Sequence, residues 1–139
     1  MNSRIMAIDP GDKRIGIAIS DPTRTIASPL MVLKHEARKK DAKKIVDLAI
    51  EHNIVKIIIG QARTFDGQVS FEGRKAERLA EAIKEISSIS IELWDESFST
   101  QKARHSRIEM GVKRSKRKGH LDEIAATIIL QTYLEEQII

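Results

Sequence analysis

The feature that most constrains the fold of this chain is a short, continuous apolar run, Val55–Gly60, with the sequence VKIIIG. The run is too uniformly apolar for a strand with one solvated face, so it predicts a central strand covered on both faces. A preceding segment, Ala37–His52, has apolar residues at helical spacing and lysines on the other side, which predicts an amphipathic crossover helix. A buried strand that follows a crossover helix indicates an α/β fold.

Three extended segments come before that helix. The runs Arg4–Asp9 and Ile15–Ser20 flank the turn sequence PGDKR and predict an opening β-hairpin. Thr25–Leu33 predicts a third strand, and Pro29 within it favours an edge position because proline cannot donate a ladder hydrogen bond. The chain therefore begins with an antiparallel meander.

The rest of the chain alternates between helical and strand-like segments. We expect a helix over Glu72–Ile86, a strand over Ile89–Asp95, a helix over Ser99–Met110, a basic loop over Gly111–Gly119 and a last helix over Leu121–Gln137. With right-handed crossovers these elements predict a mixed five-stranded sheet of order 3-2-1-4-5, its second strand antiparallel, flanked by helices. A length of 139 residues suits a single domain spanning 1–139.

Composition excludes several classes of protein. The chain has no cysteine, which rules out a disulfide scaffold, a thiol nucleophile and a thiolate metal site. No secretory signal is apparent, and no apolar run approaches the roughly 20 residues of a membrane span. We therefore expect a cytoplasmic protein with no membrane contact.

Acidic residues follow two strands that the predicted order makes parallel. Asp9 ends the first strand, while Asp95 and Glu96 end the fifth, so these groups reach the same edge of the sheet. Successive strand residues point to opposite faces, so only one of the latter pair can share a face with Asp9, and Glu96 is favoured. Asp122 opens the last helix on the stripe that must pack against the sheet, and its carboxylate is expected at the same edge.

Three converging carboxylates repel one another unless a cation neutralises them. Mg²⁺ and Mn²⁺ prefer such oxygen ligands, and a pair of these ions can activate water and stabilise the leaving oxygen of a phosphodiester. Asp9, Glu96 and Asp122 are therefore predicted as catalytic residues and ligands of two divalent ions. Taken singly, Asp9 could instead be turn material and Asp122 a residue favoured by the helix dipole.

The sequence resembles the YqgF family of ribonuclease-H-like proteins, which are regarded as nucleases of pre-16S rRNA and also as Holliday-junction resolvases. The motifs that carry the resemblance are IMAIDPGDKRIGIAISD, TIASPL, VKIIIG, WDESFST and LDEIAATIILQTYL, which together extend over nearly the whole chain. The family's acidic positions correspond to Asp9, Glu96 and Asp122. The resemblance implies a single ribonuclease-H-like domain that processes pre-16S rRNA in ribosome biogenesis.

Two departures from the family pattern accompany this resemblance. Ser97 stands where the family usually has arginine, and Gln61 and Ala62 stand where it usually has leucine and proline. These departures keep open a catalytically weakened nucleic-acid-binding module. A resolvase of branched DNA is a further alternative, and it would need a symmetric dimer to place two cuts, whereas the rRNA nuclease could be a monomer or a homodimer.

Positive charge is concentrated beside the predicted site. Eight basic residues occur between Lys102 and Lys118 against a single acidic residue, although the whole chain has a formal net charge of only +4. Lysine and arginine at such positions neutralise phosphates and displace counterions, so we expect the substrate to be structured RNA, with branched DNA as the alternative. The predicted nucleic-acid-binding residues are Lys13, Arg14, Arg63, Lys102, Arg107, Lys113, Arg114, Lys116, Arg117 and Lys118.

Overall fold

The structure is a computed structural model that describes residues 3–63, 66–71, 73–95 and 121–137. Its five strands form one sheet of order β3-β2-β1-β4-β5, in which β1 is antiparallel to β2 and parallel to β4, and β4 is parallel to β5. The strands are β1 (Arg4–Pro10), β2 (Arg14–Ser20), β3 (Ala27–Lys34), β4 (Ile54–Gln61) and β5 (Ser90–Asp95). The predicted order and the antiparallel second strand are confirmed, and β3 lies at an edge as Pro29 indicated.

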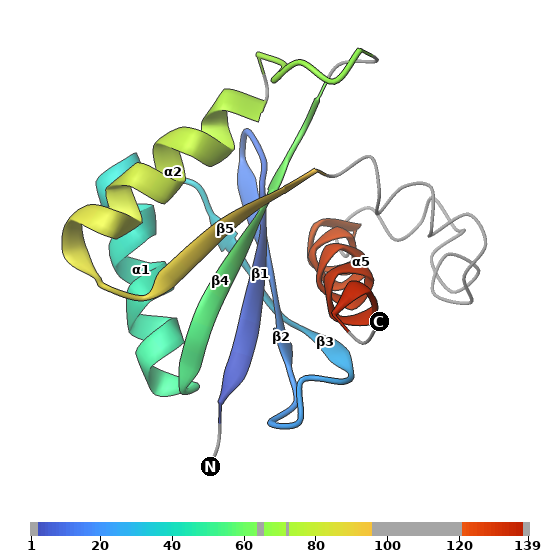
Figure 1. Ribbon diagram of the computed structural model, residues 1–139. Coiled ribbons are helices and arrows are strands. Elements are labelled where there is room, and N and C mark those ends of the chain that lie inside the picture. Colours follow the sequence, from blue (N-terminus) through green and yellow to red (C-terminus); the bar gives the residue numbers. More distant parts are fainter. Residues whose placement is uncertain (1–2, 64–65, 72, 96–120, 138–139) are drawn as a thin grey trace.

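Helices cover both faces of the sheet. Helices α1 (Arg38–Glu51) and α2 (Gly73–Ile86) lie on one face, and α5 (Leu121–Glu136) lies on the other (Figure 1). The predicted helix over Ser99–Met110 and the predicted loop over Gly111–Gly119 fall outside the described residues. Within the described part of the chain, every helix is too short or too polar to cross a membrane.

The boundary of β3 differs from the sequence prediction, which began this strand at Thr25. The strand begins at Ala27 because the Asp21 carboxylate accepts hydrogen bonds from the backbone N–H groups of Thr25 at 2.8 Å and Ile26 at 2.9 Å. These bonds hold the segment in a loop and leave its N–H groups unavailable to the sheet. They also hold the pKa of Asp21 far below its usual range, with the Ile26 N–H as the largest contributor.

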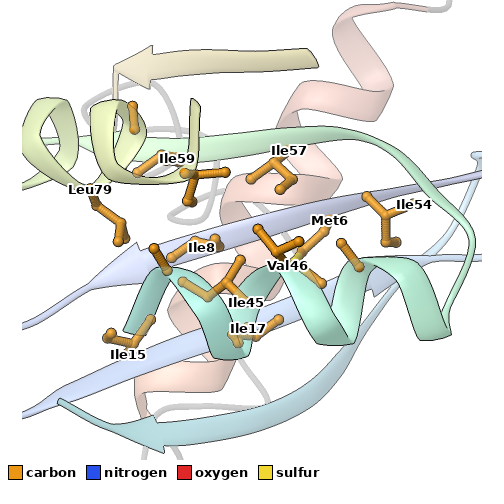
Figure 2. Packing of buried hydrophobic residues seen from close by; sticks show 14 of the residues in the cluster. Met6, Ile8, Ile15, Ile17, Ile45, Val46, Ile54, Ile57, Ile59 and Leu79 are labelled. Atoms are coloured by element: carbon orange, nitrogen blue, oxygen red, sulfur yellow. The ribbon is translucent and has the colours of Figure 1, made fainter. Parts of the chain in front are cut away.

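Strand β4 is covered on both faces, as its apolar run predicted, although β1 rather than β4 is the central strand of the sheet. Ile57, Ile58 and Ile59 are each fully buried at 0% exposure. Ile57 and Ile59 pack toward α1 and α2 in the larger of two apolar clusters, which Figure 2 shows between the helices and the sheet. Ile58 belongs to the second cluster, under α5. Alternation along β4 therefore supplies both halves of the core.

A polar network ties α5 to the sheet. The Lys56 ammonium donates to the Tyr133 hydroxyl at 2.7 Å and lies 2.7 Å from the Glu92 carboxylate, while the rings of Tyr133 and Trp94 meet edge to face at 5.2 Å between centroids. The hydrogen bond to Glu92, followed by the one to Tyr133, raises the pKa of Lys56 above its ordinary value. The helix itself packs over β2, β3 and β1, and this network ties Tyr133, near its C-terminal end, to β4 and β5.

Replacing Lys56 with methionine is expected to lower the free energy of unfolding by up to about 1 kcal/mol at neutral pH, because the pair with Glu92 is partly solvated. A raised lysine pKa stabilises the fold below the ordinary value of 10.5, and this contribution is lost as the pH rises through the higher folded-state pKa. Urea unfolding should therefore show that the difference in free energy of unfolding between wild type and Lys56→Met is smaller above pH 10.5 than at pH 7. A difference in free energy of unfolding that stays constant across this pH range would contradict the stabilising role of Lys56.

Candidate active site

The first predicted acidic residue, Asp9, lies near the carboxyl end of β1, opposite Gly16 of β2. Side chains alternate along β1: Ile5 and Ala7 belong to the cluster under α5, and Met6 and Ile8 belong to the cluster under α1. Asp9 continues the first series. Its carboxylate is therefore on the α5 face of the sheet, at the edge where parallel strands end.

Helix α5 runs antiparallel to β1, so it begins at that same edge. Tyr133, near the C-terminal end of α5, bonds to Lys56, which pairs with Ile5 at the start of β1. Counting back from Tyr133 to Asp122 gives a helical rise of about 16 Å, and counting forward from Ile5 to Asp9 gives a strand rise of about 13 Å. The first helical turn, which contains Asp122, thus lies near the level of Asp9.

Side-chain alternation along β5 decides the face of the sheet on which Asp95 lies. Trp94 packs against Tyr133 under α5, so the adjacent Asp95 points to the opposite face, where it is in register with Gln61. Asp95 and Asp9 are therefore on different faces of the sheet. Glu96 and the side chain of Asp122 lie outside the described part, so the ligand set of Asp9, Glu96 and Asp122 remains a prediction.

Within the residues that the structure describes, no three histidine, aspartate or glutamate side chains gather as a metal site. Of the three predicted ligands, Asp9 is the one whose side chain lies in the described part of the structure. Its carboxylate oxygens suit a hard divalent cation, and the residue is only partly buried at the end of the strand. The donor chemistry of Asp9 therefore fits the predicted ion.

Basic side chains lie on the same face as Asp9. Arg14 of β2 pairs with Lys34 of β3, and Gly16, opposite Asp9, pairs with Val32. Lys13, Arg14, Val32 and Lys34 together line a shallow surface hollow, which we call the β2–β3 hollow. The structure thus brings the predicted Lys13 and Arg14 together and adds Lys34, which the sequence prediction missed because it depends on the register between β2 and β3.

Arg63, another predicted nucleic-acid contact, is held toward the α2 side of the sheet. Its guanidinium donates to the side-chain oxygen of Gln61 and to the backbone oxygen of Gly67, each at 3.1 Å. Gln61 is 1% exposed, and its amide also donates to Glu77 of α2 at 3.2 Å. The unusual glutamine at this position therefore links the end of β4 to α2 and orients Arg63.

Gly73 completes this connection between β4 and α2. A Cβ atom at this position would lie 2.1 Å from the backbone oxygen of Ala62, so the close approach of loop and helix requires glycine.

The other predicted nucleic-acid-binding residues, which fall between 102 and 118, are not among the described residues: Lys102, Arg107, Lys113, Arg114, Lys116, Arg117 and Lys118.

Solved structures with the same arrangement define the class of fold. Thermus thermophilus RuvC in complex with Holliday junction substrate superimposes with a TM-score of 0.63 at 15% identity, covering 98% of this chain and 96% of that one. The fowlpox virus resolvase bound to Holliday junction DNA gives a TM-score of 0.58 at 16% identity, covering 98% and 99%. The chain therefore has a RuvC-like ribonuclease-H fold.

Sequence comparison gives the family. A family model described as "RuvX: Holliday junction resolvase" matches residues 3–136. A protein of Thermoanaerobacter pseudethanolicus named "Putative pre-16S rRNA nuclease" is 42% identical over 96% of this chain and 97% of its own length. A protein of the same name from Clostridioides difficile is 37% identical over 99% and 98%. The chain belongs to the RuvX family, which is the YqgF family indicated by its motifs, and it is a nuclease.

Proposed function

We propose that this nuclease hydrolyses phosphodiester bonds in structured RNA and processes the precursor of 16S rRNA during ribosome biogenesis in the cytoplasm. The names of the relatives at 42% and 37% identity support this substrate, and those relatives match almost end to end. The observation that carries the catalytic part is the position of Asp9 at the carboxyl edge of the sheet, on the face where α5 begins.

In this proposal, Asp9, Glu96 and Asp122 hold two Mg²⁺ or Mn²⁺ ions at the carboxyl edge. Such ions, when bound, lower the pKa of water and stabilise the charge that develops on the phosphate. The role of the protein is to place these three carboxylates on one face of the sheet, while Asp95 points to the other face. The alternation of side chains around Trp94 therefore decides that Asp95 does not share the face of Asp9.

The β2–β3 hollow would guide the substrate backbone onto the Asp9 face. Three cations line it: Lys13 in the β1–β2 turn, Arg14 at the start of β2 and Lys34 at the end of β3. Cations arranged along a sheet contact phosphates rather than bases, so binding should depend on backbone shape and on salt more than on base identity. This agrees with structured RNA as the substrate.

Replacing Lys34 with glutamine is expected to weaken RNA binding across different sequences and to reduce the slope of log K against log salt by about 1. Lys13→Gln should act in the same way, because both side chains line the β2–β3 hollow. Lys84→Gln is the matched control, since Lys84 is an exposed lysine on α2, on the opposite face. Filter binding over a salt series measures the slopes, and equal slopes for Lys34→Gln and Lys84→Gln would contradict the assignment.

The substrate is tested by comparing cleavage of a precursor 16S rRNA fragment with cleavage of a four-way DNA junction, each with Mg²⁺, Mn²⁺ or a chelator. We expect cleavage of the RNA that requires the ion. Preferential and symmetric cleavage of the junction by a dimer would instead favour the resolvase, the alternative to which the family description points. Ion-independent cleavage would contradict the metal assignment for either substrate.

A further inference from the structure

A second basic pocket lies on the face of the sheet opposite Asp9. It has a volume of about 180 Å³ and lies between the β1–β2 turn, the start of α1 and α2. We call it the α1–α2 pocket. Ile15 and Leu79, which both belong to the apolar cluster on that face, contribute apolar walls. Its polar lining includes Gly11, Asp12, His35, Arg38, Lys75 and Arg78.

The carboxylates that line this pocket are already engaged within the protein. Asp41 is 2% exposed, contacts the His35 ring, and accepts a hydrogen bond from the backbone N–H of Glu36 at 3.1 Å. Asp12 forms an ion pair with Lys75. The carboxylates of Asp41 and Asp12 therefore already have partners other than the two arginines that line the pocket.

Arg38 and Arg78 are the two cations that remain. Both are exposed and line the pocket from different helices, and neither forms an ion pair or a side-chain hydrogen bond with any residue the structure describes. Glu81 and Glu85 lie along the adjoining surface beside the same arginines, without an ion pair to either guanidinium. Two guanidinium groups that flank one cavity favour an anion between them, since each offers a planar fork of donors that matches phosphate.

We propose that the α1–α2 pocket binds one phosphate ester group through Arg38 and Arg78. Sites for whole small molecules have volumes of about 300–1,000 Å³, so a pocket of about 180 Å³ is suited to a phosphate with the adjoining part of a sugar. Ile15 and Leu79 would then contact the carbon atoms of the sugar. The phosphate belongs either to a free nucleotide or to a nucleic-acid strand, since both present the same group.

This site is separate from the candidate active site. Asp9 and the β2–β3 hollow are on the α5 face, whereas Ile15 and Leu79 are on the α1 and α2 face, and the β1–β2 turn lies between the two. A nucleic-acid strand that passed over this turn could place one phosphate on each side of the sheet. Phosphate binding at Arg38 and Arg78 does not require the chain to cleave RNA, so the two proposals can fail independently.

The test is a titration of the full ¹⁵N-labelled chain followed by NMR, with inorganic phosphate, adenosine monophosphate, adenosine and a short RNA duplex as separate probes. We expect the three phosphate-bearing probes to shift the amide signals of Gly11 and Arg38 saturably, and adenosine to leave them unchanged. Arg38→Gln and Arg78→Gln should each weaken this binding roughly tenfold, because a charged hydrogen bond is lost. Arg74→Gln, an exposed arginine of α2 outside the pocket lining, is the matched control and should bind as wild type does.

The probes also distinguish the two sources of phosphate. If adenosine monophosphate saturates the shifts at a lower concentration than the RNA duplex does, the pocket is a nucleotide site; if the duplex binds more tightly, it is a strand contact, and in both cases Arg38→Gln weakens the binding. The proposal is overturned if no phosphate-bearing probe shifts these signals. It is equally overturned if Arg38→Gln combined with Arg78→Gln binds as tightly as the control.

Discussion

Asp9→Asn is expected to lower the rate of RNA cleavage by on the order of 10³-fold while leaving the fold unchanged. Asparagine keeps the shape of the side chain but removes the charge that would hold a divalent ion, and metal stabilisation of the transition state is worth several kcal/mol. The measurement is single-turnover cleavage of a precursor 16S rRNA fragment with Mn²⁺. Circular dichroism of the variant checks that it remains folded.

Asp95→Asn is the informative comparison for this experiment. Asp95 lies one residue before Glu96 but points to the opposite face of the sheet from Asp9. We expect Asp95→Asn to keep most of the activity and Glu96→Gln to lose it as Asp9→Asn does. Wild-type activity in Asp9→Asn would overturn the site, and a loss confined to Asp95→Asn would move the site to the other face.

The second large effect is on stability. Ile58→Ala is expected to lower the free energy of unfolding by about 2–5 kcal/mol, because Ile58 is fully buried in the middle of β4, an interior strand, and α5 would cover the cavity left behind. Urea unfolding should show a lower midpoint with an unchanged slope. Truncation of this side chain tests directly whether α5 covers that face of the sheet.

Val55→Ala on the same strand is the control. Val55 is 50% exposed, so its truncation should change the free energy of unfolding by no more than about 0.5 kcal/mol. The comparison separates loss of packing from any general effect of alanine on strand propensity, since both substitutions replace a β-branched residue in β4. Similar costs for Ile58→Ala and Val55→Ala would mean that the second face of β4 is not packed as the structure has it.

Much of the fold follows from local patterns. The run at Ile57–Ile59 predicts its own burial, Pro29 predicts an edge strand, and the lengths of the helical segments predict crossovers, so the strand order could be inferred from the sequence. Alternation along a strand also predicts that only one of Asp95 and Glu96 can share a face with Asp9, and Asp95 lies on the other face. These features depend on periods of two or about 3.6 residues, which a sequence carries directly.

Other features of the site depend on which elements meet. Lys34 joins Arg14 only through the register of β2 with β3, and Gln61 orients Arg63 only because α2 returns beside the end of β4. In the sequence, Gln61 stands out only as a departure from the family pattern, since no local pattern says what its amide would contact. Its bonds to Glu77 and Arg63 show a structural role in the connection between β4 and α2.

The amino-acid sequence by itself determined the layered α/β fold, the edge of the sheet that carries Asp9, and the family to which the chain belongs. Those properties follow from periodicity and from motifs whose residues are close together in the chain. Only the tertiary structure decided which cations gather beside Asp9 and that Arg38 and Arg78 flank one pocket on the other face. The physical reason is that contacts between separate elements depend on strand register and helix placement, which arise from packing of the whole core.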